Sequence, residues 1–154
     1  MLFRSALQQG LRCRAALVAI KDRDQRILLC RYAEQHPLYP GLWDISSFGY
    51  PYPGESCLDA ALRITSSRFL QANKELLLVT RVPASPATAN RELALFQNRP
   101  ERFYPQVRPD GDITHTMSID EDELAALLRE MPELIAPTLR MIAGYVFSAT
   151  HGAM

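Results

Sequence analysis

The chain has 154 residues, of which 47% are apolar and 22% are charged, and this balance is typical of one globular domain with a sizeable core. Basic and acidic side chains number 17 each, so neither nucleic acid nor a membrane surface is expected as a partner. The cysteines form no metal or disulfide pattern, and no apolar run approaches the roughly 20 residues of a membrane helix. Arginines interrupt the N-terminal segment, where a signal peptide would be apolar. These features together predict a cytoplasmic location.

The N-terminal third of the chain is predicted to contain two strands. Residues 1–10 form a short arm, and residues 11–150 form a single domain. The apolar runs at 14–20 and 26–32 have the length of strands, and the polar residues between them predict a β-hairpin. A proline-rich loop at 34–41 then leads into the run LWDIS at 42–46.

The segment 49–70, GYPYPGESCLDAALRITSSRFL, combines a turn with a helix. Its prolines and glycines set the dihedral angles of the turn, and Ser56 can cap the first free amides of the helix. An apolar face with helical spacing is predicted to be buried. Its members are Leu58, Ala61, Leu62, Thr65 and Phe69.

Two further strands, at 75–82 and 91–97, flank a loop at 83–90 that is rich in Pro, Ala, Ser and Thr. An irregular arginine- and proline-rich segment at 99–111 precedes a last strand at 113–118. Ser118 and Glu121 predict a capping box for a helix that runs to about residue 131. A final helix carries Ile135, Leu139, Ile142 and Val146 on one face. This order of elements predicts an α+β or mixed-sheet sandwich.

The segment 49–70 resembles the signature of the Nudix family, G-x5-E-x7-R-E-x2-E-E-x-G. Gly49, Glu55 and Arg63 match the first glycine, the first glutamate and the arginine. The family's three metal-binding glutamates and its second glycine fall on other residues, namely Ile64, Ser67, Arg68 and Leu70. The segments 13–15, 30–32 and 38–46 are similar to the branch that includes isopentenyl diphosphate isomerase-like proteins.

The resemblance implies an α/β/α sandwich, a Nudix fold with a mixed β-sheet flanked by helices. It also implies that Gly49, Gly54, Glu55 and Arg63 are structural residues of the box, with the Glu55–Arg63 pair tying the turn to the helix. Asp59, four residues before Arg63, is placed to compete for the same guanidinium.

Positions 64, 67 and 68 lie on one helical face, where three carboxylates would supply the oxygen ligands that Mg²⁺ requires. Ile64 has no oxygen, Ser67 has one neutral hydroxyl, and Arg68 carries a positive charge. We therefore predict no bound metal or other cofactor and no Mg²⁺-dependent pyrophosphohydrolase activity.

Several functions remain open at this point. In the first, the chain binds a small phosphorylated or nucleotide-like ligand through Arg68, with Arg31 and the exposed aromatic Tyr50 assisting, or acts as a regulatory or interaction module. Against this, Arg68 can equally be a solvated or ion-paired arginine, and the box can serve the fold alone.

The alternative is an active hydrolase of nucleoside-diphosphate-linked or prenyl diphosphate compounds. It would hold Mg²⁺ through Glu55, Asp59, Asp110 and Asp112, which the sequence does not cluster. A third hypothesis is a homodimer formed through the segment 99–111.

Two residues have roles that the sequence leaves open. Cys57 lies in the first turn of the predicted helix, where a thiolate is favoured, but a small buried side chain is the ordinary alternative. His115 falls where the family often supplies an acid near the site, and without a named partner a histidine is more often an ordinary loop residue.

Overall fold

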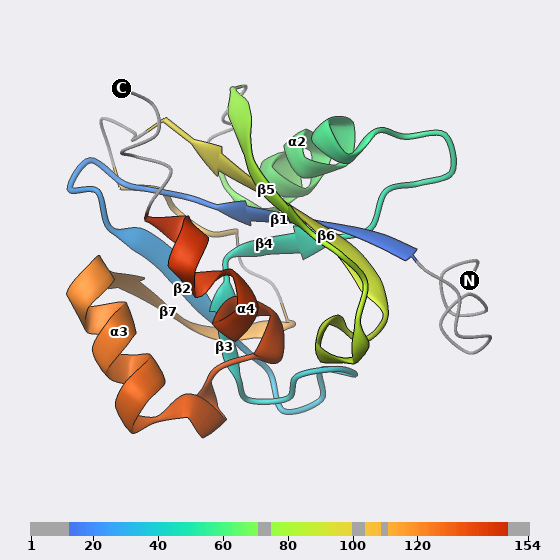
Figure 1. Cartoon of the computed structure of the whole chain (residues 1–154). Helices are drawn as coiled ribbons and strands as arrows, with labels where there is room; N and C mark the ends of the chain where they lie inside the picture. Colours follow the sequence, from blue (N-terminus) through green and yellow to red (C-terminus); the bar gives the residue numbers. More distant parts are fainter. Residues whose placement is uncertain (1–12, 71–74, 100–103, 109–110, 148–154) are drawn as a thin grey trace.

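The structure, a computed structural model, describes residues 13–70, 75–99, 104–108 and 111–147. Its larger sheet has the strand order β4-β1-β6-β5 (Figure 1). These strands are β4 (Ser47–Gly49), β1 (Cys13–Ala19), β6 (Arg91–Asn98) and β5 (Leu76–Val82). The sheet is mixed, because β1 pairs with β6 in parallel and the other pairs are antiparallel. The predicted N-terminal arm lies outside the described residues.

The smaller sheet is antiparallel and has the order β3-β2-β7. Its strands are β3 (Trp43–Ile45), β2 (Ile27–Tyr32) and β7 (Ile113–Ile119). The hairpin predicted between residues 14–20 and 26–32 is wrong as a strand pair, since β1 and β2 belong to different sheets. Only an isolated bridge between Lys21 and Ile27 joins them at the turn. Both edges of β1 are already occupied, by β4 and β6.

Within the described ranges, three α-helices pack on these sheets: α2 (Cys57–Arg68), α3 (Glu121–Glu130) and α4 (Pro137–Val146). Short 3-10 turns lie at η1 (Pro86–Thr88) and η2 (Pro132–Leu134). Alternation along β1 divides the core, because Ala16 and Val18 pack with α2 while Ala15 and Leu17 pack on the other face. The mixed sheet flanked by helices is the predicted fold class.

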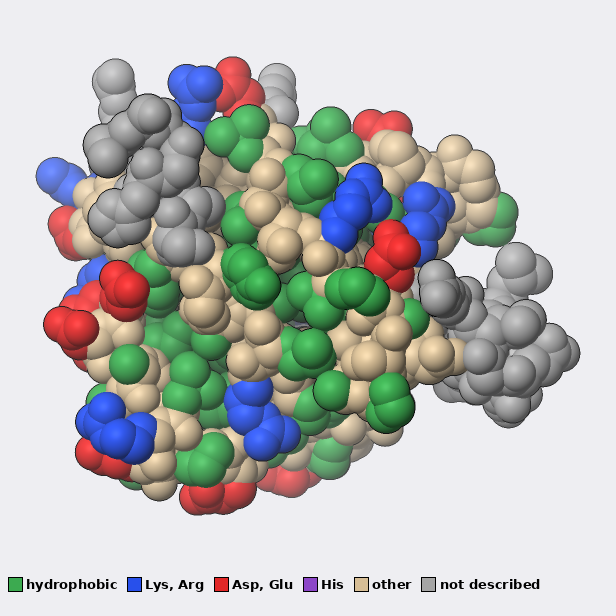
Figure 2. Space-filling view, in the orientation of Figure 1, with side chains coloured by type: hydrophobic (Ala, Val, Ile, Leu, Met, Phe, Trp, Pro, Cys, Tyr) green, Lys and Arg blue, Asp and Glu red, His purple; other side chains and the backbone are tan. Residues whose placement is uncertain are grey.

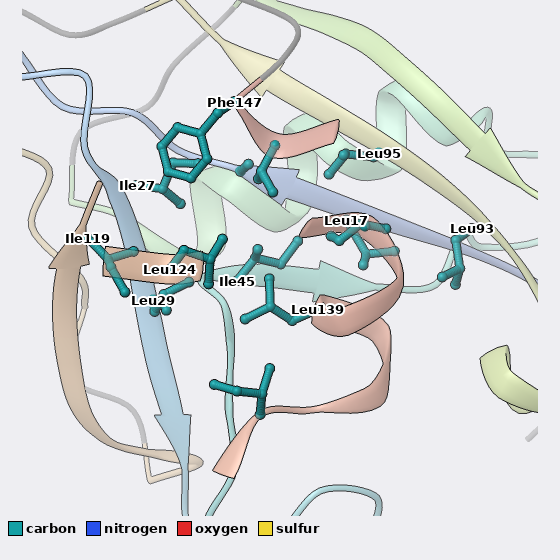
Figure 3. Packing of buried hydrophobic residues seen from close by; sticks show 14 of the residues in the cluster. Leu17, Ile27, Leu29, Ile45, Leu93, Leu95, Ile119, Leu124, Leu139 and Phe147 are labelled. Carbon is teal, nitrogen blue, oxygen red and sulfur yellow. The ribbon is translucent and has the colours of Figure 1, made fainter. Parts of the chain in front are cut away.

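The larger of the two apolar clusters lies between α4, β1 and the smaller sheet. Figure 3 shows Leu17, Ile45 and Leu139 converging from these elements. The apolar face predicted for the final helix is confirmed for Leu139, Ile142 and Val146, which are buried on α4. Ile135 is also buried, but it precedes the helix. Pro137 is the first residue of α4, where a missing amide hydrogen costs nothing.

Helix α2 begins where the sequence predicts it. The side chain of Ser56 accepts a hydrogen bond from the backbone N–H of Asp59 at 3.0 Å. The predicted buried face is confirmed for Ala61, Thr65 and Phe69, whereas Leu58 is 42% exposed and Leu62 is half-buried. Small residues dominate the face that contacts the sheet, and they allow the helix to approach closely. The buried residues of α2 are Cys57, Ala60, Ala61, Ile64 and Thr65.

The cap of α3 also differs from the prediction. Asp120, rather than Ser118, is the N-cap, and Glu123, rather than Glu121, completes the capping box. Ser118 lies within β7, which continues to Ile119 and therefore delays the helix by two residues.

The surface agrees with the balanced composition. On the face shown in Figure 2, acidic and basic side chains of the described residues are interspersed. Among the described residues, no helix is both long enough and apolar enough to cross a membrane.

Candidate functional site

A tight turn leads into α2. The backbone N–H of Glu55 donates to the Tyr52 carbonyl oxygen at 2.9 Å, which closes a four-residue turn. Gly54, the third residue of this turn, has a φ of +82°, a conformation that other residues adopt only with strain. Pro53 before it supplies the fixed φ that such a turn requires at its second position.

The ion pair between Glu55 and Arg63 fixes this turn to the helix. The Arg63 guanidinium donates from Nε to Glu55 Oε2 at 3.0 Å and from Nη2 to Oε1 at 2.9 Å. It also donates to the carbonyl of Tyr50 at 2.8 Å and lies 3.8 Å from the centre of the Tyr52 ring. The hydrogen bonds from Arg63 lower the pKa of Glu55. Because both carboxylate oxygens are engaged, Glu55 is poorly placed to hold a metal.

The residues at the three glutamate positions lie in three different environments. Ile64 is 8% exposed and belongs to the apolar cluster between α2 and the sheet. It contacts Gly49 so closely that a Cβ built on that glycine would lie 2.6 Å from Ile64 Cδ1. Ser67 is exposed, and Arg68 is half-buried.

These three side chains do not fit a magnesium ion, which requires several oxygen ligands. Their only neutral oxygen is the Ser67 hydroxyl, and Arg68 brings a positive charge. Across the ranges that the structure describes, no group of three or more His, Cys, Asp and Glu side chains is arranged to hold a metal. The absence of Mg²⁺-dependent pyrophosphohydrolase activity stays a prediction.

Arg68 lines a cavity of about 120 Å³ between α2 and the smaller sheet. The other described residues that line it are Cys30, Tyr32, His36, Ile45, Ser46, Phe48, Asp112 and Ile113. Cys30 and Tyr32 are two residues apart on β2, so their side chains lie on the same face of the strand, and both line the cavity. The chain bends at Ser46 as it passes from β3 to β4, and this bend brings the Ser46 side chain to the same place.

Behind the cavity lies a buried acid. Asp44 is 0% exposed, and its Oδ2 accepts hydrogen bonds from the hydroxyls of Tyr32 and Thr138, each at 3.0 Å. Burial raises the pKa of Asp44 to about 6, against the opposing effect of these hydrogen bonds and of that from the Ile45 amide. Burial and Asp44 together raise the pKa of the Tyr32 hydroxyl, and the nearby Arg68 charge partly opposes them.

His36 forms part of the cavity wall in one defined tautomer. Its Nδ1 accepts hydrogen bonds from the backbone amides of Leu38 at 3.3 Å and Tyr39 at 3.0 Å, so the ring proton is on Nε2. The imidazole stacks on Tyr32 with 4.0 Å between ring centres. Burial lowers the pKa of His36, and the charge of Asp112 acts in the opposite direction. The acceptor role of Nδ1 and the lowered pKa both favour the neutral imidazole.

A buried arginine holds the loop 34–41 next to the β4 end. Arg91 is 0% exposed and donates from Nε to the Thr88 carbonyl at 2.9 Å. Its two terminal nitrogens donate to the hydroxyls of Tyr50 at 3.0 Å and Tyr39 at 2.7 Å. The guanidinium also lies 5.0 Å from the centre of the Phe48 ring. Arg91 therefore positions the aromatic side chains on this side of the molecule.

The structure does not bring the three predicted ligand residues together. Arg68 lines the cavity, whereas Arg31 and Tyr50 are absent from its described lining. Arg31 donates to the Gly41 carbonyl at 2.9 Å and lies 3.6 Å from Glu34. The hydroxyl of Tyr50 accepts from Arg91.

The other candidates are dispersed. Asp59 is exposed on α2, Asp112 lies at the cavity, and Asp110 falls outside the described residues. His115 is exposed on β7, and Cys57 is buried against the sheet. Of the irregular segment 99–111, residues 100–103 and 109–110 lie outside the description. The amide of Arg108 donates to the Arg68 carbonyl at 2.8 Å, so part of this segment packs along the end of α2.

Sequence reasoning missed five residues of this region: Tyr32, His36, Asp44, Ser46 and Arg91. A charged residue within an apolar strand-length run is the signal that could have indicated Asp44 and Arg91, because burial of an ion requires partners. No comparable signal marks Ser46, whose position depends on the bend between two sheets.

No family model and no curated protein sequence matches the chain. Solved structures do match it. DR0079 from Deinococcus radiodurans superposes with a TM-score of 0.74 at 16% identity over 88% of this chain and 83% of that one. A MutT Nudix hydrolase from Burkholderia pseudomallei gives 0.66 at 18% identity over 88% and 98% of the two chains. The Nudix domain of NrtR from Shewanella oneidensis, solved with ADP-ribose, gives 0.64 at 16% over 93% and 89%.

The chain has the Nudix fold. At these identities the likeness extends to the fold and not to the chemistry. In this Nudix fold, the signature-like segment 49–70 spans the end of β4, the turn and helix α2, and its last helical residue, Arg68, lines the cavity.

Proposed function

We propose that this protein is a degenerate Nudix-fold binder of a small phosphorylated or nucleotide-like ligand, without Mg²⁺-dependent pyrophosphohydrolase activity. One observation carries the proposal: at a position where the family signature has a metal-binding glutamate, the guanidinium of Arg68 lines a polar cavity. A metal there would join carboxylates to a diphosphate, whereas an arginine can contact the phosphate oxygens directly.

The class of ligand follows from this charge. Arginine presents a planar set of donors that matches phosphate oxygens, and partial burial strengthens such contacts relative to water. The Nudix domain of NrtR, which has the same fold, was solved with ADP-ribose, a nucleotide-like diphosphate. Arg31 and Tyr50 are proposed only for a part of the ligand that extends beyond the cavity. A regulatory or interaction role in the cytoplasm is compatible with such binding.

Isothermal titration calorimetry with ADP, ADP-ribose and prenyl diphosphates, in buffer containing EDTA, tests the proposal. Wild-type protein should bind at least one of these compounds without metal. Arg68→Ala should weaken that binding about tenfold or more, the usual size of a lost charge-assisted hydrogen bond. Arg129→Ala is the matched control, because Arg129 is an exposed helical arginine on α3, and it should bind as wild type does.

Two results would favour the competing hypotheses. Release of phosphate or nucleoside monophosphate that requires Mg²⁺ or Mn²⁺ would support the active hydrolase with unconventional ligands. A mass that depends on protein concentration, with no response to any phosphorylated compound, would support the homodimer. Equal binding by wild type and Arg68→Ala would refute the role of Arg68.

A further inference from the structure

The cavity beside Arg68 is closed at one end and open at the other. Its floor consists of the buried residues Cys30, Tyr32, Ile45 and Ser46, none more than 6% exposed. Its rim consists of residues that are half-buried or exposed: His36, Phe48, Arg68, Asp112 and Ile113. A ligand group therefore enters from the rim, and only the end of a longer molecule reaches the floor.

The size of the cavity limits what enters. A water molecule takes about 30 Å³ in the liquid, so a cavity of about 120 Å³ has room for roughly four of them. A terminal phosphoryl group, one phosphorus with three oxygens, fits within this volume. A diphosphate that carries a sugar on both sides does not, because one sugar would have to pass the floor.

The floor of the cavity contains the hydroxyl group of Ser46, which can form a hydrogen bond with a ligand. Ser46 is 2% exposed, and within the described part of the chain its Oγ has no hydrogen-bond partner. A buried hydroxyl left in this state costs free energy, and a ligand oxygen in the cavity would satisfy it. On the rim, the amides of Leu38 and Tyr39 occupy His36 Nδ1, which leaves Nε2–H as the ring donor.

One residue of the rim is an acceptor. The backbone of Asp112 is fixed by the Ala33 amide, which donates to its carbonyl at 2.8 Å. A carboxylate repels a fully ionised oxyanion at short range but accepts a hydrogen bond from an oxyanion that keeps a proton. Asp112 beside Arg68 therefore favours an anion that has both ionised oxygens and one O–H group.

We infer that this cavity is an end-on site for a terminal phosphoryl group that retains one proton, with Arg68, Ser46 and His36 donating and Asp112 accepting. Terminal phosphoryl groups lose their second proton only near pH 6, so they can present such an O–H, whereas the internal diphosphate of ADP-ribose and the sulfate ion do not. The inference rests on the proposed function and narrows it from phosphorylated compounds in general to those with a free phosphoryl end.

Calorimetric titration of the whole chain at about pH 5.5, where a terminal phosphoryl group keeps its second proton and sulfate does not, tests this with inorganic phosphate, sulfate, ADP and ADP-ribose. Phosphate should bind about tenfold or more tightly than sulfate, and ADP about tenfold or more tightly than ADP-ribose. Ser46→Ala should weaken phosphate binding. Asp112→Asn should reduce the difference in affinity between phosphate and sulfate, because the amide of asparagine can donate a hydrogen bond to an ionised oxygen. Asp122→Asn, on exposed α3, is the control and should leave this difference unchanged.

The possible failures separate the two proposals. If ADP-ribose binds as tightly as ADP and both depend on Arg68, the protein is a phosphate binder but the end-on site is wrong. If phosphate and sulfate bind equally to wild type, the role of Asp112 is wrong. If none of the four compounds binds at millimolar concentration, both the end-on site and the proposed function are refuted. Circular dichroism of each variant establishes that a loss of binding is not a loss of folding.

Discussion

Restoring a glutamate at position 64 should destabilise the protein rather than create a metal site. Ile64 is 8% exposed and packs in the apolar cluster under α2. Replacing it forfeits about 2 kcal/mol of apolar burial. A buried carboxyl without a partner is also forced into its neutral form, which at pH 7 costs up to about 4 kcal/mol for a group with an ordinary pKa near 4.3. We therefore expect Ile64→Glu to lose roughly 4–6 kcal/mol.

The sign of the pH dependence follows from the same reasoning. The folded state raises the pKa of the introduced carboxyl, so the penalty is small below about pH 4.3 and grows as the pH rises. Lowering the pH from 7 to 5 should recover about 2–3 kcal/mol in Ile64→Glu relative to wild type.

Urea denaturation followed by circular dichroism, at pH 5 and pH 7 and with and without Mg²⁺, measures both quantities. Ser67→Glu is the matched control, since Ser67 is exposed on the same helix and its substitution should change stability by less than about 0.5 kcal/mol. An Ile64→Glu variant as stable as wild type at pH 7, or one that Mg²⁺ stabilises, would refute the burial argument and reopen the metal site.

Three further variants test other contacts. Gly49→Ala should cost about 1–3 kcal/mol through overpacking against Ile64, and adding Ile64→Val should relieve part of it, as a double-mutant cycle in urea would show. Arg63→Lys should lower the unfolding temperature above pH 4.5 and have less effect as the pH falls, because the depressed pKa of Glu55 makes the pair stabilising only when Glu55 is ionised. Since the pKa of Asp44 rises from 3.8 to about 6, wild type should lose roughly 2 kcal/mol more than Asp44→Asn between pH 4 and pH 7. Parallel stability profiles of wild type and either pH-dependent variant would contradict the argument for that variant.

The local elements were predictable because their signals are local. Ser56 marks the start of α2, and the apolar runs mark β1, β2, β5 and β6 to within a residue or two. The Glu55–Arg63 pair came from the resemblance of the segment to a known signature, and its two hydrogen bonds are present. In each of these cases the partners are within eight residues of each other.

The pairing of strands was not predictable from the same signals. A polar turn between two apolar runs favours a hairpin, but it does not reveal that β4 and β6 occupy both edges of β1. The exposure of Leu58 on α2 has a similar cause. Its apolar side chain suggests burial, whereas the close approach of the helix to the sheet selects the small side chain of Ala60, which the pattern did not indicate.

The sequence pointed to two residues that line the cavity, Arg68 as a ligand contact and Asp112 as a metal ligand of the alternative hydrolase. The other members of the site come from segments far apart in the sequence, as the hydrogen bonds of Asp44 to Thr138 and of Arg91 to Tyr39 illustrate, at separations of 94 and 52 residues. No periodicity in the sequence connects residues at such distances. Buried charge was the available clue, and it identifies a residue that needs partners without identifying the partners.

The three substitutions in the signature are not independent losses. Ile64 fills space over Gly49 and adds to the core, so α2 sits on the sheet through a contact that a carboxylate cannot make. Arg68, one turn later, places a positive charge at a cavity that also contains the acceptor Asp112. A glutamate at position 68 would place a second carboxylate at this cavity beside that of Asp112. A magnesium site on this face of α2 would therefore require two changes, one at the core contact of position 64 and one at the cavity charge of position 68.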